Sequence, residues 1–208
     1  SWLAFMGSCL GLSRANPTTY FLNLDIGGGT TNLALGMGGD VLRTGCLFAG
    51  ARHFQFELGT YRITALSAYA ARLLKDLKIE RSIGDSLSPN ERRNILDFYA
   101  ALIEAAVCGD RSRLDQDPFR YHEQVPFVPP PDVTSPVITL SGGVGELVYY
   151  QIRGRPVPAT TAFGDLGIDL AQRLIQSPAL SQRLRTHIPM NFGHATAYGL
   201  SLYGTEVS

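Results

Sequence analysis

Residues Asp25-Ile26-Gly27-Gly28-Gly29-Thr30-Thr31-Asn32 join two predicted strands through three consecutive glycines. Before them, Tyr20–Ile26 alternates as a strand, with Asp25 on the face opposite its apolar residues. After them, Thr30–Leu35 reads as a second strand and Val41–Phe48 as a third, with a glycine-rich turn between the two. The sequence therefore predicts a three-stranded antiparallel meander with a glycine loop at one end.

The glycine loop has the residue types of a phosphate-binding segment. Gly27, Gly28 and Gly29 allow a tight turn and let an anion approach the backbone amides without a Cβ in the way. Thr30 and Thr31 add hydroxyl donors for phosphate oxygens, and Asp25 is a candidate to hold a hydrated Mg²⁺. The alternative is an ordinary glycine-rich hairpin turn. The loop is not a P-loop, because no Gly-Lys pair closes it, and not a dinucleotide fingerprint, because a strand follows it.

A second glycine motif lies far along the chain, in Ile138-Thr139-Leu140-Ser141-Gly142-Gly143-Val144-Gly145-Glu146. The apolar run Val137–Leu140 predicts a strand, and a helix is expected from Gly145 to Ile152. Such a junction lets a flat ring or a phosphate lie on the backbone of Gly142, Gly143 and Val144 near a helix N-terminus. The alternative is a tight strand-to-helix turn. Two glycine motifs at strand ends together predict one nucleotide cleft.

Other segments complete an α/β pattern with a mixed sheet. Ser88-Pro89-Asn90-Glu91 is a helix start with a capping box and proline at the first position. Half of the chain's 12 prolines lie in Gln116–Pro136, which predicts a long extended connection. The further expected elements are a hairpin of Phe54–Glu57 with Tyr61–Ala65, helices over Ala68–Lys78 and from Ser177-Pro178, and a strand over Ile188–Phe192.

Composition excludes several classes of protein. Lys plus Arg and Asp plus Glu both number 18, and 45% of the residues are hydrophobic. This balance argues against a disordered chain and against a nucleic-acid binder held by a basic surface. No apolar run approaches the ~20 residues of a membrane helix. The three cysteines are too widely spaced for a zinc site and predict reduced thiols in a cytoplasmic protein. The chain starts at Ser1 without an initiator Met, so we expect a fragment of a longer protein.

Several polar residues have both a functional and a structural interpretation. His53 and His194 have no nucleophile or metal partner at useful spacing, which favours structural histidines. Asp165 is expected to cap the helix that follows it. Glu146 would contact a ribose or favour the helix N-terminus, and Arg52 would contact phosphate or form a surface ion pair.

The two glycine motifs, L-D-I-G-G-G-T-T and S-G-G-V, resemble the second phosphate motif and the adenosine motif of the actin-like (ribonuclease H-like) ATPases. The finer resemblance is to the ethanolamine ammonia-lyase reactivating factors, the ethanolamine utilization protein A family. It includes the stretches Thr44–Arg52, Tyr61–Thr64 and Phe163–Gly167. By this resemblance, residues 1–208 are the C-terminal part of an actin-like ATPase domain, with a Pro-rich excursion at about 116–136. The N-terminal lobe with the other phosphate motif would be absent.

The resemblance implies an ATP-dependent, Mg²⁺-requiring chaperone. Such a factor frees adenosylcobalamin-dependent ethanolamine ammonia-lyase from a damaged cofactor so that an intact one can bind. By carry-over, Gly27, Gly28, Gly29, Thr30 and Thr31 would cradle the β- and γ-phosphates, and Asp25 would lie near Mg²⁺ and its waters. Gly142, Gly143 and Val144 would flank adenosine. The resemblance also implies a cytoplasmic location, with association to a bacterial microcompartment. The alternatives are a sugar or acetate-type kinase on the same fold, and a non-catalytic interaction module.

Overall fold

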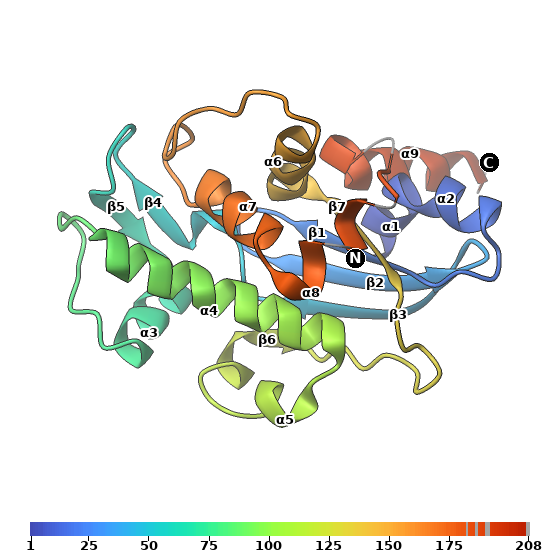
Figure 1. Cartoon of the computed structure of the whole chain (residues 1–208), viewed down its shortest axis with the longest axis horizontal. Coiled ribbons are helices and arrows are strands. Elements are labelled where there is room, and N and C mark those ends of the chain that lie inside the picture. The colour runs from blue at the N-terminus through green and yellow to red at the C-terminus, as the bar shows by residue number, and fades with distance from the viewer. Residues whose placement is uncertain (182, 186, 190–191, 207–208) are drawn as a thin grey trace.

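A five-stranded mixed sheet forms the centre of the computed structural model, which describes residues 1–181, 183–185, 187–189 and 192–206 (Figure 1). Its strand order is β6-β3-β2-β1-β7, and a separate hairpin pairs β4 with β5. The predicted α/β class and mixed sheet are confirmed. The strands are β1 (Phe21–Ile26), β2 (Thr31–Met37), β3 (Asp40–Leu47), β4 (Phe54–Phe56), β5 (Ile63–Leu66), β6 (Glu123–Val125) and β7 (Val137–Ser141).

Strand direction brings the two glycine motifs together. The predicted meander is present, because β1 pairs antiparallel with β2 and β2 antiparallel with β3. In contrast, β7 lies parallel to β1, with Asp25 opposite Ser141. Parallel neighbours end at the same edge of a sheet, so the loop after β1 and the junction after β7 meet there. Ligands of open α/β sheets bind outside this carboxyl edge.

Both faces of the sheet are covered by helices, as Figure 1 shows. Leu22, Leu24 and Ile26 of β1 face the larger core, which α4, α6 and α7 complete. Phe21 faces the smaller core, which Phe5 and neighbouring residues of α1 and α2 form. β1 is therefore buried on both faces. The helices are α1 (Trp2–Ser8), α2 (Leu10–Ala15), α3 (Ala68–Asp76), α4 (Pro89–Cys108), α5 (Arg111–Leu114), α6 (Gly142–Ile152), α7 (Gly167–Ile175), α8 (Pro178–Ser181) and α9 (Ala195–Glu206).

Local signals set two of the helix starts. α4 begins with the predicted capping box, in which Ser88 Oγ accepts from the Glu91 N–H and Glu91 Oε2 accepts from the Ser88 N–H. α8 follows Ser177 and Pro178 as expected, but it has only four residues. α6 starts at Gly142 and not at the predicted Gly145. Glycine disfavours helix in an isolated segment, whereas here the first turn is fixed by packing against the end of β1.

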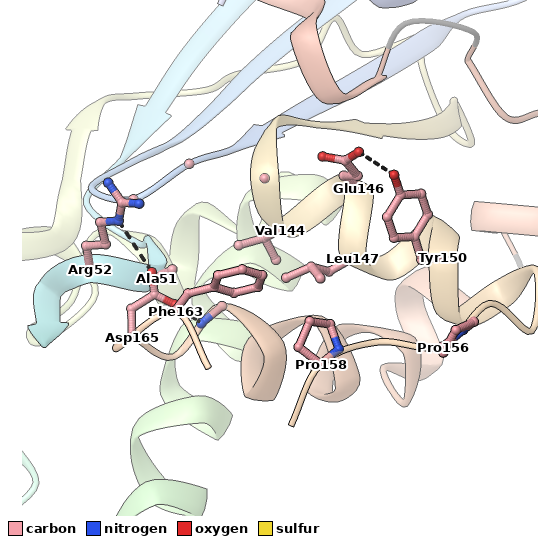
Figure 2. Close-up of a pocket in the computed structure, with 14 residues that line it drawn as sticks. Ala51, Arg52, Val144, Glu146, Leu147, Tyr150, Pro156, Pro158, Phe163 and Asp165 are labelled. Carbon is pink, nitrogen blue, oxygen red and sulfur yellow. Dashed lines mark hydrogen bonds and ion pairs between the residues drawn. The ribbon is translucent and has the colours of Figure 1, made fainter. Parts of the chain in front are cut away.

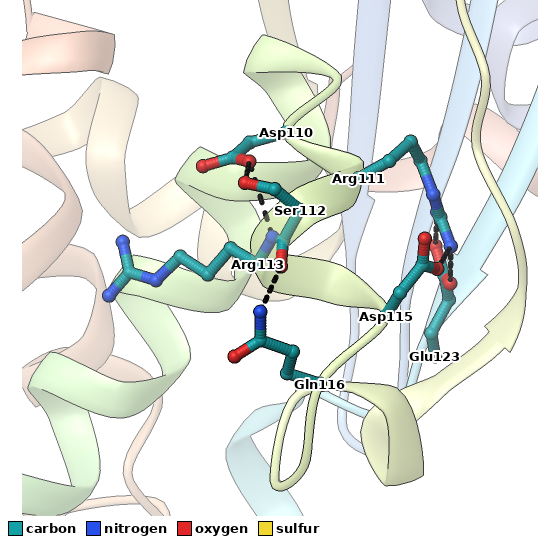
Figure 3. Close-up of polar contacts among 7 residues, drawn as sticks. All are labelled: Asp110, Arg111, Ser112, Arg113, Asp115, Gln116 and Glu123. Atoms are coloured by element: carbon teal, nitrogen blue, oxygen red, sulfur yellow. Dashed lines mark hydrogen bonds and ion pairs between the residues drawn. The ribbon is translucent and has the colours of Figure 1, made fainter.

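The proline-rich connection is anchored to the rest of the fold. Its predicted extended path contains the short strand β6, which pairs with the end of β3. Arg111 of α5 binds both carboxylate oxygens of Glu123, at 2.6 and 2.8 Å, and also pairs with Asp115 (Figure 3). Glu123 is a nearly buried side chain at 5% exposure, so this bidentate pair holds α5 against the sheet.

The strand predicted over Ile188–Phe192 was wrong for its described residues. Ile188 and Pro189 belong to no element, Phe192 starts a 3₁₀ turn, and residues 190 and 191 lie outside the described residues. Pro189 has no N–H to give to a sheet ladder, which explains the failure of the pattern there. Among the described helices, none combines the length and apolarity needed to cross a membrane.

Candidate functional site

The Gly27–Gly29 loop is held from one side by the segment after β3. The Ala51 N–H donates to the Gly27 carbonyl at 3.1 Å, and the Arg52 N–H donates to the Gly28 carbonyl at 2.6 Å. Gly50 makes this approach possible, because a Cβ there would lie 2.5 Å from the Gly28 carbonyl oxygen. The loop carbonyls therefore face inward. In the part of the chain that the structure describes, the N–H groups of Gly28 and Gly29 donate to no protein acceptor.

The glycines of this loop leave open space where a side chain would begin. None of the three has a positive φ, so a left-handed turn does not explain them. A Cβ on Gly29 would meet no heavy atom within 4 Å, and one on Gly27 would meet only the Thr30 carbonyl oxygen at 3.8 Å. A Cβ on Gly28 would touch the Arg52 side chain at 3.1 Å. The open side is thus suited to the close approach of an anion to backbone amides.

The two threonines after the loop differ in their surroundings. Thr31 is fully buried, and its hydroxyl donates to the Ala49 carbonyl at 2.8 Å. Thr30 is half-buried, and its Oγ1 accepts a hydrogen bond from Asn32 Nδ2 at 3.2 Å, which leaves its proton free to donate. Thr31 therefore fastens β2 to the segment after β3, and Thr30 keeps a donor for a ligand.

The second glycine motif packs directly against the end of β1. Gly142 has φ +78, and a Cβ there would lie 2.6 Å from the Ile26 carbonyl oxygen and 2.9 Å from Asp25 Oδ1. Only glycine fits this position. A Cβ on Gly143 would meet no heavy atom within 4 Å, so Gly143 opens outward as Gly29 does. Ser141 Oγ donates to Asp25 Oδ1 at 2.9 Å, which ties the Asp25 carboxylate to the same junction.

One pocket of about 630 Å³ joins both motifs (Figure 2). Of the predicted site residues, Gly27, Gly28, Gly143 and Val144 line it, while Asp25, Gly29, Thr30, Thr31 and Gly142 are not among its lining residues. The volume falls within the roughly 300–1,000 Å³ of small-molecule sites. The other lining residues are Ala51, Arg52, Glu146, Leu147, Tyr150, Pro156, Pro158, Phe163, Asp165 and Gly167.

Charged groups lie at two ends of the pocket lining. Arg52 Nε is 3.4 Å from Asp165 Oδ2, and the Arg52 side chain is 71% exposed, so its cation remains open to a ligand. Asp165 Oδ1 accepts from the N–H of Gly167, the first residue of α7, at 2.8 Å, but the N-cap of this helix is Leu166 and not the predicted Asp165. Glu146 Oε1 accepts from the Tyr150 hydroxyl at 2.7 Å, and this bond raises the pKa of Tyr150.

The loop between α6 and α7 contributes lining residues that the sequence did not predict. Phe163 is 54% exposed, and its ring points toward Val144 and Leu147 in Figure 2. Thr161 and Gly164, on either side of Phe163, have φ values of +61 and +66. A β-branched residue at positive φ is rare, and such strain is concentrated at functional segments. The family resemblance includes Phe163–Gly167, but this loop has no hydrophobic period that would assign Phe163 to a pocket wall.

Neither candidate histidine lines the pocket. His53 is buried, its Nδ1 shares a hydrogen bond with Ser67 Oγ at 2.7 Å, and burial lowers its pKa. His194 is exposed. Among the described residues, no group of three His, Cys, Asp or Glu side chains is arranged to hold a metal. A Mg²⁺ that depends on Asp25 would thus take its other ligands from water and phosphate, as this cation usually does.

Comparison with known proteins identifies relatives along almost the whole chain. The reactivase EutA of Salmonella typhimurium, described as an ethanolamine ammonia-lyase reactivase, is 31% identical over 192 residues. The protein of the same description from Escherichia coli K12 is 30% identical over 192 residues. Each match covers 89% of this chain but 38% of the relative, so the chain spans about two fifths of the length of these proteins.

Two solved structures are similar over part of their own length. MreB 5 of Spiroplasma citri bound to AMPPNP matches 84% of this chain and 56% of its own, with 18% identity and a TM-score of 0.37. A PilM–PilN type IV pilus biogenesis complex matches 98% of this chain and 51% of its own, with 17% identity and a TM-score of 0.39. The model of the family "Ethanolamine utilisation protein EutA" matches residues 1–208. The chain therefore belongs to the EutA family of ethanolamine utilisation proteins.

Proposed function

We propose that this chain is the nucleotide-binding part of a reactivating chaperone for ethanolamine ammonia-lyase. In this proposal the protein uses ATP and Mg²⁺ to promote exchange of damaged cobalamin for intact adenosylcobalamin on the lyase. Membership of the EutA family supports the reactivating role, because its curated relatives carry that description. The proposal includes a cytoplasmic location, with association to a bacterial microcompartment, and an actin-like arrangement of the nucleotide site.

One observation carries the nucleotide part of the proposal. Two glycine motifs, from the ends of the parallel strands β1 and β7, line the same pocket. In each motif one glycine, Gly29 or Gly143, faces space in which a Cβ would meet no protein atom. Open space at a glycine is not confined to these motifs, since Gly11 has it too, but here two such positions follow neighbouring parallel strands. A ligand with an anionic end and a flat end explains both.

The pocket residues divide into two groups in this proposal. The amides of Gly27, Gly28 and Gly29 and the Thr30 hydroxyl bind the phosphate groups. Thr31 shapes the loop through its bond to Ala49. The Arg52 side chain packs against Gly28 and is exposed, so its guanidinium adds positive charge beside the phosphates.

The base and sugar occupy the other end of the pocket. Gly142 and Gly143 supply bare backbone at the start of α6, and Val144 supplies an apolar wall that is 2% exposed. Phe163, opposite, offers a ring face to a base. Glu146 lies in the same lining as an acceptor for ribose or amino groups.

Asp25 is the residue proposed to act on Mg²⁺, through the waters of the ion. The ion would neutralise charge on the β- and γ-phosphates. Phosphoryl transfer needs chiefly positioning and charge neutralisation, so backbone amides, one carboxylate and one arginine are a suitable partial set of groups. The remaining groups would come from outside these 208 residues.

The reactivating role is tested with the lyase itself. We would load ethanolamine ammonia-lyase with a cobalamin that lacks the adenosyl group, then add the full-length protein, ATP, Mg²⁺ and adenosylcobalamin. Recovery of deamination that requires all four additions supports the proposal, and the Gly29→Ala variant should not restore it. Failure to restore deamination would contradict the proposed role as a reactivating chaperone. Phosphate transfer from ATP to a small alcohol would favour a kinase instead.

A further inference from the structure

A chain of buried hydrogen bonds runs along the α1 side of the sheet and ends on Asp25. Cys9 Sγ lies 2.8 Å from Thr139 Oγ1, and Thr139 Oγ1 donates to Asn23 Oδ1 at 3.0 Å. Asn23 Nδ2 donates to Ser141 Oγ at 2.9 Å, and Ser141 Oγ donates to Asp25 Oδ1 at 2.9 Å. The parallel register produces this path, since Asn23 faces Thr139 and Asp25 faces Ser141 across β1 and β7.

The four residues that precede Asp25 in this chain of hydrogen bonds are shielded from water. Cys9, Thr139 and Ser141 are fully buried, and Asn23 is 1% exposed. A polar group in such surroundings must be bonded within the protein, because an unmade hydrogen bond there is costly. Apolar residues could fill these positions in a purely structural layer. Four polar side chains that are linked to one another by hydrogen bonds therefore need a reason other than packing.

The contacts from Thr139 to Asp25 are consistent with donation in one direction along this chain. A carboxylate oxygen accepts, and the single proton of Ser141 goes to Asp25 Oδ1. Ser141 Oγ must then accept from the Asn23 amide, which places Nδ2 toward Ser141 and Oδ1 toward Thr139. Thr139 Oγ1 donates to that Oδ1 and can then accept from Cys9 Sγ, which also lies 3.6 Å from Asn23 Oδ1.

Cys9 is suited to be the first donor of the chain. Burial raises the pKa of its thiol to about 11, so the thiol keeps its proton at neutral pH. Cys9 also lies at the junction of α1 and α2. The chain thus connects the N-terminal helices to the carboxylate at the pocket.

We propose that Ser141, Asn23, Thr139 and Cys9 are positioning residues, whose one-way donor chain holds Asp25 Oδ1 and leaves Oδ2 to act on a metal ion. The proposal rests on the proposed role of Asp25 toward Mg²⁺. Gly142 completes the arrangement, because a Cβ at that position would lie 2.9 Å from Asp25 Oδ1 and displace the carboxylate. Loss of a donor several bonds away should therefore disturb metal-dependent binding and leave metal-free binding unchanged.

The test compares the binding of ATP with Mg²⁺ and of ATP with EDTA to the full-length protein, by calorimetry. Ser141→Ala removes the donor to Asp25. Thr139→Val removes the donor to Asn23, the residue that in turn donates to Ser141. We expect each to weaken Mg²⁺–ATP binding, Ser141→Ala by about tenfold, since hydrogen bonds to charged groups are the stronger ones. Binding of metal-free ATP should not change. Thr139→Ser keeps the hydroxyl and should restore wild-type behaviour.

Thr44→Val is the matched control, because it makes the same chemical change at an exposed residue of β3, elsewhere in the sheet. If Thr139→Val and Ser141→Ala lower the melting temperature but weaken binding equally with and without Mg²⁺, the chain is only structural and the proposal is overturned. If wild-type protein binds ATP equally with and without Mg²⁺, the proposed role of Asp25 toward Mg²⁺ is wrong, and the proposal that the donor chain positions Asp25 for this role is wrong as well. A crystal structure of Thr139→Val in which the Asp25 carboxylate has turned would support the proposal independently of nucleotide.

Discussion

Adding one methyl group to Gly29 or Gly143 should separate ligand binding from folding. A Cβ on either residue would meet no protein heavy atom within 4 Å, and neither residue has a positive φ. The protein should therefore accept Gly29→Ala and Gly143→Ala without strain. Replacing glycine at a compatible position restricts the unfolded chain, and it adds about 0.4–1 kcal/mol to the free energy of unfolding.

The same methyl groups would occupy the space in which a nucleotide approaches the backbone. At Gly29, one or two amide-to-phosphate hydrogen bonds would be lost or lengthened. Each such bond to a charged group contributes roughly 1.5–3 kcal/mol, and about 1.4 kcal/mol corresponds to a tenfold change in Kd. We therefore expect Gly29→Ala to weaken Mg²⁺–ATP binding by about tenfold to a hundredfold, and Gly143→Ala by about tenfold.

The assay pairs thermal unfolding without ligand with calorimetric titration of Mg²⁺–ATP, both on the full-length protein. Gly11→Ala is the matched control, because Gly11 also has open space at its Cβ but lies on the exposed side of α2 and belongs to neither glycine motif. It should raise stability in the same way and leave binding unchanged. If Gly29→Ala and Gly143→Ala bind Mg²⁺–ATP as tightly as wild type, the open space is not a ligand site and the reasoning is refuted.

Three further predictions concern the pocket wall, the anchored excursion and two buried histidines. Phe163→Ala should weaken Mg²⁺–ATP binding by about tenfold, through lost stacking, and leave Mg²⁺–tripolyphosphate binding unchanged in the same titration; equal losses for both ligands would refute a base contact. Glu123→Gln should lower the free energy of unfolding in urea by roughly 1–3 kcal/mol, because the bidentate bond to Arg111 loses its charge; no loss would mean that the pair is not stabilising. Burial lowers the pKa of both His53 and His122, so the unfolded chain takes up protons first and stability should fall as pH drops below about 6.5. Urea unfolding at several pH values, compared with a variant in which both are Gln, checks this; an unchanged pH dependence would contradict it.

The central strands and the meeting of the two glycine motifs followed from local patterns. Alternation placed β1 to β3 within one or two residues of their observed bounds, and the capping box placed the start of α4. The pairing of the loop after β1 with the junction after β7 was predicted from two glycine motifs at strand ends. The parallel register of β1 and β7 confirms that the motifs lie together. Strong local signals and global structure agree at these positions.

Other parts of the site depend on contacts that no local pattern encodes. The Pro156–Phe163 loop has no period, and its residues line the pocket because α6 and α7 bring its two ends together. The buried hydroxyl of Thr31 donates to the carbonyl of Ala49, a residue of the segment after the next strand. Asn23 and Thr139, which looked like ordinary strand residues, acquire a common role only through the register of β1 and β7.

The most direct test of the central claim is calorimetric titration of Mg²⁺–ATP into the full-length protein and its Asp25→Asn variant. Asn keeps the size of Asp25 and an acceptor for the Ser141 hydroxyl, and it removes only the charge. We expect Mg²⁺ to lower the Kd of the wild type for ATP. In the variant, the ratio of the Kd values without and with Mg²⁺ should be smaller by about tenfold or more. Absence of both heat and thermal stabilisation in the wild type would mean that the glycine motifs serve only as turns, and the nucleotide account would be wrong.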